Sequence, residues 1–457
     1  MKKGTQKRIT SNNQLHSIRE RELKRDSETK KPNGQPAAAY FTPTLVHICA
    51  KVIADTFDAQ SSIEDLPEEL RQLVTEQLST ELPLKTAVQR VQSQEYWCAR
   101  CEDNWDAGLL ADCVDKKTEV DWKRVFLQRS LEEKLMECAN DLPSDAQLFE
   151  IQQLCQLSAA SIYSLRLSRL RCHFDLHELF GWLPQLREFS VTYGVLNTGI
   201  EFELKMFGMH DSDATTLRDA LRNTTNLHTL RLPENRIDDN ILKGVLSGLV
   251  RNHSVTRVDL SHNTIEDGGA RALATLLMRS EPAQHIKYLN LSDNLIRAQG
   301  VADLGRALEV NASLTELLLK LNRLGDEGGK LLVESLRTNK SLVMLTLSHN
   351  EMGSETAKAL SDVLRQNSTL TSLDVAGNPF LEEGGRLIRE GVEANKTLTD
   401  LDLRGCGILE SDASAVADFL ENRKHALRRL VEEKGEREAN KKIEEAMVDK
   451  MKKLYSH

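Results

Sequence analysis

The strongest constraint on this chain is a phrase that returns at a fixed step through its second half. The phrase has the form apolar-x-x-apolar-x-apolar-x-x-Asn-x-apolar, as in VTRVDLSHNTI at residues 255–265. Seven copies stand in register at a step of 28 residues, lengthened once to 31. The asparagines of the first six copies are Asn235, Asn263, Asn294, Asn322, Asn350 and Asn378, and Cys406 takes their place in the seventh. A fixed period of this length predicts a stack of similar units.

The phrase is the signature of leucine-rich repeats. Each copy opens with a short strand whose alternate residues point inward, and the Asn side chain is expected to bond backbone groups where the chain turns away. The rest of each copy, such as GGARALATLLMRS at residues 268–280, has apolar residues at helical spacing. This combination resembles the ribonuclease-inhibitor class. It predicts an α/β solenoid with parallel strands on the concave face and helices on the convex face.

For one copy alone, the entropy cost of ordering its residues exceeds the free energy gained from the apolar surface that it buries. Neighbouring copies must therefore stack to be stable. Stability therefore explains the repetition, and we expect function to depend on the residues that differ between copies. The third, fifth and eighth positions of the phrase face the concave side, because they alternate with the buried leucines.

At these concave positions the sequence predicts a partner-binding surface in the middle and late copies. Its residues are an apolar group and an acidic group: Tyr288, Leu318, Leu321 and Met344, then Asp374, Asp400 and Asp402. An exposed apolar cluster rimmed by charge is typical of protein-binding surfaces. The alternative is the ordinary scatter of apolar residues over any protein surface.

Charge is distributed unevenly along the 457 residues. The net charge is −9, made of +6 in residues 1–31, +3 in residues 421–457 and −18 between them. An acidic body argues against a nucleic-acid groove on the main domain. No run of about 18 uncharged apolar residues predicts a membrane span, and no apolar run after Met1 predicts a secretory signal. Eight scattered cysteines fit reduced thiols in the cytosol.

Four regions follow from these patterns. Residues 1–37 form a basic tail that is disordered or ordered by a partner. Residues 38–150 form an N-terminal helical region. Residues 151–410 form the solenoid, with degenerate copies before residue 227. Residues 411–457 form a C-terminal cap and a charged helical extension whose apolar stripe either closes the solenoid or receives a partner helix.

The sequence predicts no catalysis, cofactor or metal. Phosphate-binding loops, nucleophile elbows and zinc-protease motifs do not occur. Cys98 and Cys101 form a Cys-x-x-Cys pair, but structural zinc needs four ligands and no second pair follows. His262 and His349 occupy equivalent positions three copies apart, too distant to share a metal. We interpret both as solvated polar residues.

Two segments are more specific to one protein family than the repeat phrase is. They are YFTPTLVHICAKVIADTF at residues 40–57 and TYGVLNTGIEFELKMFGMHDSDATTLRDALRNTTNLHTLRLPENRIDD at residues 192–239. Through them, residues 38–430 resemble the T-complex-associated testis-expressed protein family, the fifth subunit of the nexin–dynein regulatory complex. The resemblance implies a non-catalytic scaffold in the ciliary or flagellar axoneme that links doublet microtubules and regulates dynein-driven motility. It implies other subunits as partners, with doublet microtubules or inner-arm dynein as further contacts, and neither nucleic acid nor membrane.

A second class stays open at this stage. Repeats of this type also resemble Ran GTPase-activating protein, which would make the chain a regulator of a small GTPase. That family begins its repeats near the N-terminus and ends in a strongly acidic tail. Here about 150 residues precede the repeats and the last 37 are slightly basic. A nucleotide-sensing receptor fits less well, because no phosphate-binding loop precedes the repeats.

Overall fold

The computed structural model describes residues 44–57, 63, 66–106, 108, 120–138, 142–195, 206–279, 285–430 and 432. Contacts divide the chain into two compact units, one of residues 1–57 with 63–78 and one of residues 58–62 with 79–457. The predicted helical region 38–150 thus contributes to both units. The predicted basic tail 1–37, and the part of the apolar stripe beyond residue 432, lie outside the described residues. None of the described helices is both long and apolar enough to cross a bilayer.

The described part of the first unit includes α2 (Leu45–Asp55) and α3 (Glu68–Gln77). Thr44 starts α2 by accepting a hydrogen bond from the His47 amide, and Pro67 precedes α3, where a missing N–H costs nothing. Among its described residues before the sheet, the second unit has the helices α4 (Leu84–Arg90), α5 (Gln94–Asn104), α7 (Trp122–Met136) and α8 (Asp145–Ser158).

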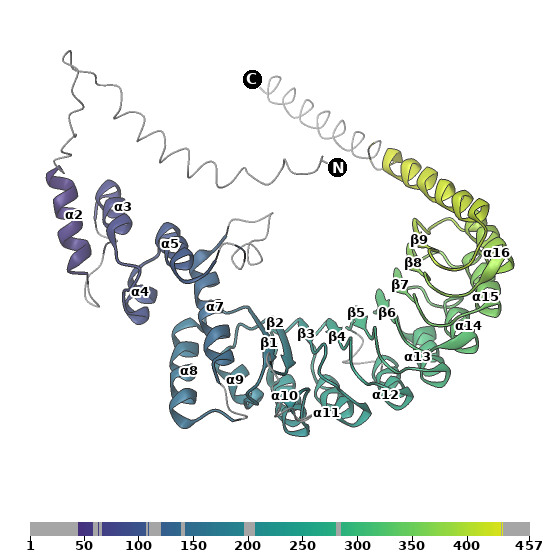
Figure 1. Ribbon diagram of the computed structural model, residues 1–457, viewed down its shortest axis with the longest axis horizontal. Coiled ribbons are helices and arrows are strands. Elements are labelled where there is room, and N and C mark those ends of the chain that lie inside the picture. The colour runs from purple at the N-terminus through teal and green to yellow at the C-terminus, as the bar shows by residue number, and fades with distance from the viewer. Residues whose placement is uncertain are drawn as a thin grey trace, which may run out of the picture. The chain divides into compact units, whose positions relative to one another are not determined.

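A nine-stranded parallel sheet follows, with its strands in chain order from β1 to β9. The strands are β1 (Ser164–Leu170), β2 (Glu188–Tyr193), β3 (Thr229–Arg231), β4 (Arg257–Asp259), β5 (Tyr288–Asn290), β6 (Glu316–Leu318), β7 (Met344–Thr346), β8 (Ser372–Asp374) and β9 (Asp400–Asp402). They line the inner side of the curve (Figure 1). This arrangement confirms the predicted solenoid.

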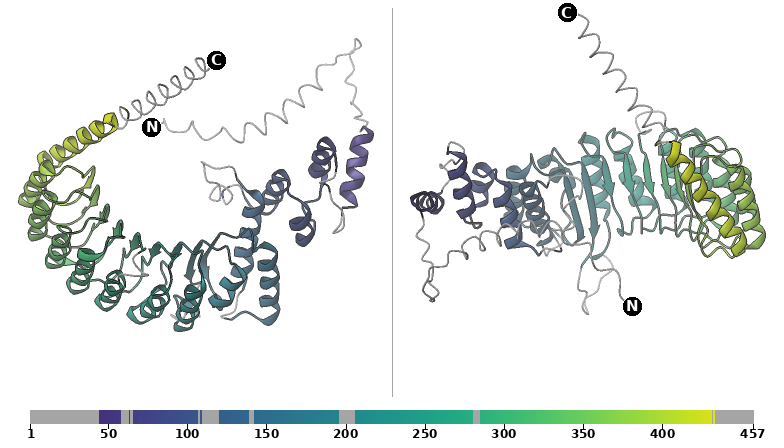
Figure 2. Two further views of the ribbon diagram at one scale, coloured as in Figure 1. Left: turned by 180° about the vertical axis from the view of Figure 1, so that it is seen from behind. Right: turned by 90° about the horizontal axis from the view of Figure 1, so that it is seen from above.

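Helices lie on the outer side of the same curve, one between each pair of strands (Figures 1 and 2). They are α9 (Leu176–Trp182), α10 (Asp211–Asn223), α11 (Asp239–Leu249), α12 (Asp267–Leu277), α13 (Ala298–Val310), α14 (Gly325–Ser335), α15 (Ser354–Leu364) and α16 (Leu381–Ala394). A further helix covers residues 410–430. Between strands and helices the repeat leucines form one continuous core, in which Leu317, Leu345 and Leu373 are at most 2% exposed.

The repeat asparagines form a buried ladder along one edge of the strands. From Asn263 to Asn378, each Nδ2 donates to a carbonyl of its own copy and to one of the preceding copy, at 2.8–3.0 Å. Each Oδ1 accepts an amide of the preceding copy, such as Ile237 N on Asn263 at 3.0 Å. In the last copy Cys406 Sγ lies 3.3 Å from the Val375 carbonyl oxygen. The ladder therefore ties every turn to its predecessor.

A second asparagine ladder runs along the opposite edge, where helices lead into strands. Asn252, Asn311, Asn339, Asn367 and Asn395 each donate to a carbonyl 31 to 34 residues earlier, at 2.8–2.9 Å. Arg423 stands 28 residues after Asn395 and bonds the carbonyl oxygens of Val392 at 3.1 Å and Asn395 at 2.6 Å. An arginine of the terminal helix thus ends this ladder in place of the next asparagine.

Aspartates tie consecutive helices together at their N-termini. Asp326, at the start of α14, accepts the amides of Gly353 and Thr356 at 2.9 and 2.8 Å, which caps α15. Asp267 caps α13 in the same way through Arg297 N and Gly300 N. A Cβ on Gly300 would lie 2.5 Å from Asp267 Oδ1, so the contact requires glycine there. The helices are therefore linked directly, as well as through the core.

The first strand of the sheet is covered by α7. The carboxylate of Glu132 is 2% exposed and accepts the Arg166 amide of β1 at 3.0 Å and Gln128 Nε2 at 3.1 Å. Burial raises the pKa of Glu132 above its usual range, although the Arg166 amide and nearby positive charges oppose the rise. The helical region thus supplies a buried acceptor to the edge of the sheet.

Candidate functional site

The concave face carries two rows of side chains, because the strands from β2 to β9 pair without slipping in register. One row holds the third position of each copy: Glu188, Thr229, Arg257, Tyr288, Glu316, Met344, Ser372 and Asp400. The other holds the fifth position: Ser190, Arg231, Asp259, Asn290, Leu318, Thr346, Asp374 and Asp402. A rigid sheet therefore displays one side chain per row from each copy.

Tyr288 is half-buried beneath an arginine of the preceding strand. The Arg257 guanidinium carbon lies 4.0 Å from the centroid of the Tyr288 ring, and Arg257 Nη1 lies 3.5 Å from Glu316 Oε1. Burial raises the pKa of the Tyr288 hydroxyl, and the charge on Asp259 adds to the rise. A small hollow of about 30 Å³ opens beside the ring, lined by Thr229, Arg231 and Asp259 as well. Tyr288 thus belongs to a charged and aromatic network.

The other apolar residues of the predicted surface lie one and two strands further on. Leu318 is half-buried in β6, and Met344 in β7 is 37% exposed. Glu316 lies between Tyr288 and Met344 in the same row, so the structure separates these two side chains by a carboxylate. The Glu316 carboxylate therefore interrupts the apolar group. Its place at the third position of its copy already followed from the repeat spacing.

Leu321 occupies the eighth position with an unusual backbone. Its φ is +58°, in the left-handed region, and its side chain is 44% exposed. The equivalent residues of the other six regular copies also have positive φ and are Glu234, His262, Asp293, His349, Gly377 and Gly405. Short polar residues and glycine tolerate this conformation, whereas a bulky leucine is strained. The copy thus exposes an apolar side chain at a cost to its own stability.

The three predicted acidic residues all have partners. Asp374 accepts the Ser348 hydroxyl at 2.8 Å, and Asp400 lies 2.8 Å from Lys424 Nζ. Arg404 pairs with Asp402, and this contact holds the pKa of Asp402 below its usual range. Asp374 and Asp402 are also direct neighbours across β8 and β9. The acids form a paired surface at the last two strands.

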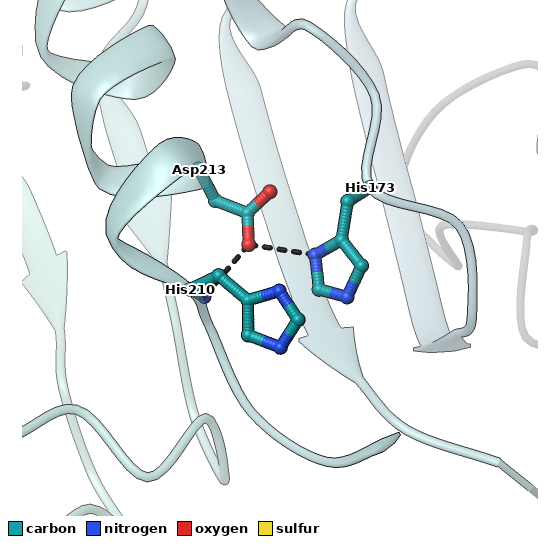
Figure 3. Close-up of side chains that lie close together, drawn as sticks. All are labelled: His173, His210 and Asp213. Atoms are coloured by element: carbon teal, nitrogen blue, oxygen red, sulfur yellow. Dashed lines mark hydrogen bonds and ion pairs between the residues drawn. The ribbon is translucent and has the colours of Figure 1, made fainter. Parts of the chain in front are cut away.

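A cluster of two histidines and an aspartate lies where the chain enters α10 (Figure 3). His173 Nδ1 lies 2.7 Å from Asp213 Oδ2, which also accepts the His210 amide at 2.8 Å. The two imidazoles stack with centroids 3.9 Å apart and 14° between their planes, and Tyr193 stacks on His173 at 4.7 Å. Among the described residues this is the group that approaches metal-ligand geometry.

Its arrangement fits a structural contact better than a metal centre. Nitrogen lone pairs lie in the ring plane, so nearly parallel imidazoles direct them side by side instead of toward one point about 2 Å away. The Asp213 oxygen already receives two hydrogen bonds. The cluster joins the N-terminus of α10 to the loop that follows β1. No repeat pattern predicted this cluster, because His173 and Asp213 are 40 residues apart and lie before the regular copies begin.

The other candidate metal ligands predicted from the sequence do not form a cluster of three or more among the described residues. Cys98 and Cys101 lie on α5, and burial together with Glu102 raises the pKa of the Cys98 thiol to about 11. That thiol is therefore a poor metal ligand. His262 Nδ1 lies 2.7 Å from Asp293 Oδ2, and both side chains are about half exposed. The repeat spacing places Arg231 and Arg257 on the concave face, but it did not predict their ion pairs with Glu188 and Glu316.

Comparisons with known proteins agree with this architecture. The leucine-rich repeat family matches residues 251–274, 283–305, 310–333, 366–388 and 394–417. The chain is 29% identical over 259 residues to dynein regulatory complex subunit 5 of Mus musculus, covering 51% of each chain. It is 34% identical over 204 residues to the Chlamydomonas reinhardtii subunit 5, covering 44% of this chain and 50% of that one. The family resemblance and the repeat type are thereby confirmed.

A shorter match joins the chain to the repeat class predicted from sequence. It is 35% identical over 105 residues to the ribonuclease inhibitor of Sus scrofa, covering 23% of each chain. The chain spans about half the length of the dynein regulatory complex relatives that it matches.

Proposed function

We propose that this protein is a non-catalytic scaffold subunit of the nexin–dynein regulatory complex in the ciliary axoneme, where it helps link doublet microtubules and regulate dynein-driven motility. The observation that carries the proposal is the similarity to subunit 5 of that complex in a mammal and in an alga, at 29% and 34% identity. Its partners are then the other subunits, with doublet microtubules or inner-arm dynein as further contacts.

The geometry supports a scaffold. Two asparagine ladders and the capping aspartates hold successive turns at fixed spacing, so the concave rows form a stiff surface. Several of the charged groups that line it are paired with one another, as Arg231 is with Glu188 and Arg257 is with Glu316. A general acid or base needs a pKa near the working pH and a position within hydrogen-bond reach of the substrate. Surfaces of paired charge and partly exposed apolar residues are suited to protein binding.

Within this surface we place the docking contact at Leu318, Leu321 and Met344, with Tyr288 on one side and the acidic residues on the other. Leu321 argues for this most directly. Its left-handed backbone and 44% exposure cost stability and bury little in the isolated chain. Large apolar side chains also supply much of the energy of protein interfaces.

The proposal is tested by tagging the full chain in a ciliated cell and extracting the membranes with detergent. We expect the signal to remain on the axoneme. A Leu321→Asp, Met344→Asp variant should keep a cooperative melt but lose incorporation. The matched control is Leu381→Asp, because Leu381 has φ +61° and is 61% exposed but begins α16.

Signal that leaves with the detergent would contradict the axonemal role. Wild-type incorporation of the double variant would contradict only the docking surface. The GTPase alternative predicts a different result. It requires the purified protein to accelerate GTP hydrolysis by a Ran-type GTPase, whereas a scaffold leaves the rate unchanged.

A further inference from the structure

The last strand of the sheet has backbone N–H and C=O groups without hydrogen-bond partners in the described part of the chain, whereas the equivalent groups of the copy before it are hydrogen-bonded. At the junction before it, Val375 N donates to Asp402 O at 3.1 Å and Gly377 N donates to Arg404 O at 2.8 Å. The Thr371 carbonyl accepts the amides of Thr399 and Asp400 at 2.8 and 3.0 Å. The corresponding groups of the last copy are Leu403 N, Gly405 N and Thr399 O. No hydrogen bond among the described residues uses them.

The core is open at the same place. Leu401 and Leu403 are half-buried, whereas Leu373 and Val375, their equivalents one copy earlier, are at most 2% exposed. A cavity of about 790 Å³ runs beside them, lined also by Ile408 and by Ala413, Val416 and Ala417 of the terminal helix. It occupies the position where another copy would place its strand and its leucines.

The chain does not supply that copy within its described part. A step of 28 residues from Leu398 and Leu401 leads to Ala426 and Arg429, which lie in the helix of residues 410–430 and are exposed. Arg423 still completes the asparagine ladder on the helix side. At this end of the solenoid the helix layer is therefore capped, whereas the edge of the last strand, β9, is left without a neighbouring strand among the described residues.

Charge indicates the kind of residue that would complete the concave rows. Asp374 and Asp402 are neighbours in one row, and like charges directly opposite each other are destabilising. A basic side chain in the next position of that row would relieve this repulsion. Arg404 now pairs with Asp402 and Lys424 pairs with Asp400, so a basic segment would replace or add to these contacts, and the Arg404 side chain is 89% exposed.

We propose that this end binds an extended segment of another protein as a tenth parallel strand. The segment alternates basic and apolar residues. Its apolar side chains enter the cavity between Leu403 and Val416, and its basic side chains lie beside Asp400 and Asp402. Its backbone pairs with Leu403 N, Gly405 N and Thr399 O, the mode in which exposed sheet edges commonly capture peptides. This site shares Asp400 and Asp402 with the acidic side of the concave docking surface, but it requires neither Leu321 nor Met344 and does not rest on the axonemal role.

The test uses the full chain and a synthetic peptide that contains Lys-Leu-Lys-Leu, with binding measured by calorimetry. We expect saturable binding at one site, and slower hydrogen exchange of the Leu403 and Gly405 amides when the peptide is present. Leu403→Pro removes one donor and should weaken binding at least tenfold. Leu427→Asp, an exposed change on the terminal helix outside the cavity, should leave binding unchanged.

A charge reversal keeps the test decisive if the proline variant fails to fold. Asp402→Lys should weaken the lysine peptide at least tenfold and should bind a Glu-Leu-Glu-Leu peptide in its place. Absence of peptide binding overturns the proposal. So does protection of the Leu403 and Gly405 amides in the free chain, because it would mean that the chain covers its own edge. Protection that grows with protein concentration would identify a second copy as the occupant and equally reject the proposal.

Discussion

The two ends of the nine-stranded sheet are finished in different ways. At β1 a whole helix, α7, lies against the strand and the buried carboxylate of Glu132 accepts the Arg166 amide. At β9 the terminal helix closes the asparagine ladder through Arg423 but leaves the strand edge and the leucines beside it uncovered. The difference teaches that a solenoid has two layers to close at each end, and that closing the helix layer does not close the strand layer.

The largest expected effect contrasts the middle of the sheet with its open end. Leu345→Ala should lower the free energy of unfolding by about 2–5 kcal/mol, because Leu345 is fully buried between two copies. Leu403→Ala removes the same atoms from a half-buried site and should cost less than about half as much. Chemical denaturation of both variants measures the contrast. Equal losses would mean that the β9 end is as well covered as the middle.

The covered end should be sensitive to its buried acceptor. Glu132→Ala leaves the Arg166 amide without a partner in a dry site and should cost about 1–3 kcal/mol. Glu132→Gln keeps an acceptor and serves as the control. Hydrogen exchange of the Arg166 amide, measured beside denaturation, reports whether the strand edge itself has loosened.

The same carboxylate gives a pH dependence with a defined sign. The pKa of Glu132 in the folded state is raised above its usual value of 4.5, so the folded state holds this proton more tightly than the unfolded state. Stability from this group is therefore greatest below that value and falls as pH rises from there through the folded pKa. Glu132→Gln should flatten this part of the stability profile. A profile that is identical in both proteins would show that burial does not disfavour the charge.

At the other end the helix layer should depend on one side chain. Arg423→Ala leaves the carbonyl oxygens of Val392, Leu398 and Asn395 without their arginine donor and should cost about 1–2 kcal/mol. Because copies interact mainly with their neighbours, hydrogen exchange should speed up in α16 and not in α11. Loosening that is uniform along the solenoid would contradict the assignment of Arg423 as a local cap.

The smallest effect should be a gain. Leu321→Gly removes the side chain from a left-handed position and should stabilise the chain by about 0.5–1 kcal/mol, less any contacts that the side chain makes. His349→Gly is the matched control at an equivalent position, where the gain should be smaller. A thermal melt resolves the two. A loss of stability in Leu321→Gly would mean that the leucine packs within the fold, which would weaken its assignment to a docking surface.

The sequence predicted the features that follow from the repeat spacing. The strand and helix of each copy, the inward leucines and the outward rows follow from spacing alone, because neighbouring copies repeat one geometry. The interruption of the apolar group by Glu316 was also readable from that spacing. Contacts that do not recur from copy to copy could not be predicted from that spacing. The Arg257–Tyr288 stack depends on side-chain conformations, and the His173, His210 and Asp213 cluster lies before the regular copies begin. Arg423 was missed because an arginine replaces an asparagine at the last step.

The capping aspartates also give the solenoid a direction. Asp267 precedes the helix that it caps by one copy, as does Asp326, whereas each ladder asparagine accepts an amide of the copy before it. A ribosome releases the chain from its N-terminus, so when α13 or α15 forms, the preceding copy already presents the aspartate oxygen atoms that its first amides require. Growth in the reverse order would leave these two helix starts without their caps until the preceding copy had formed.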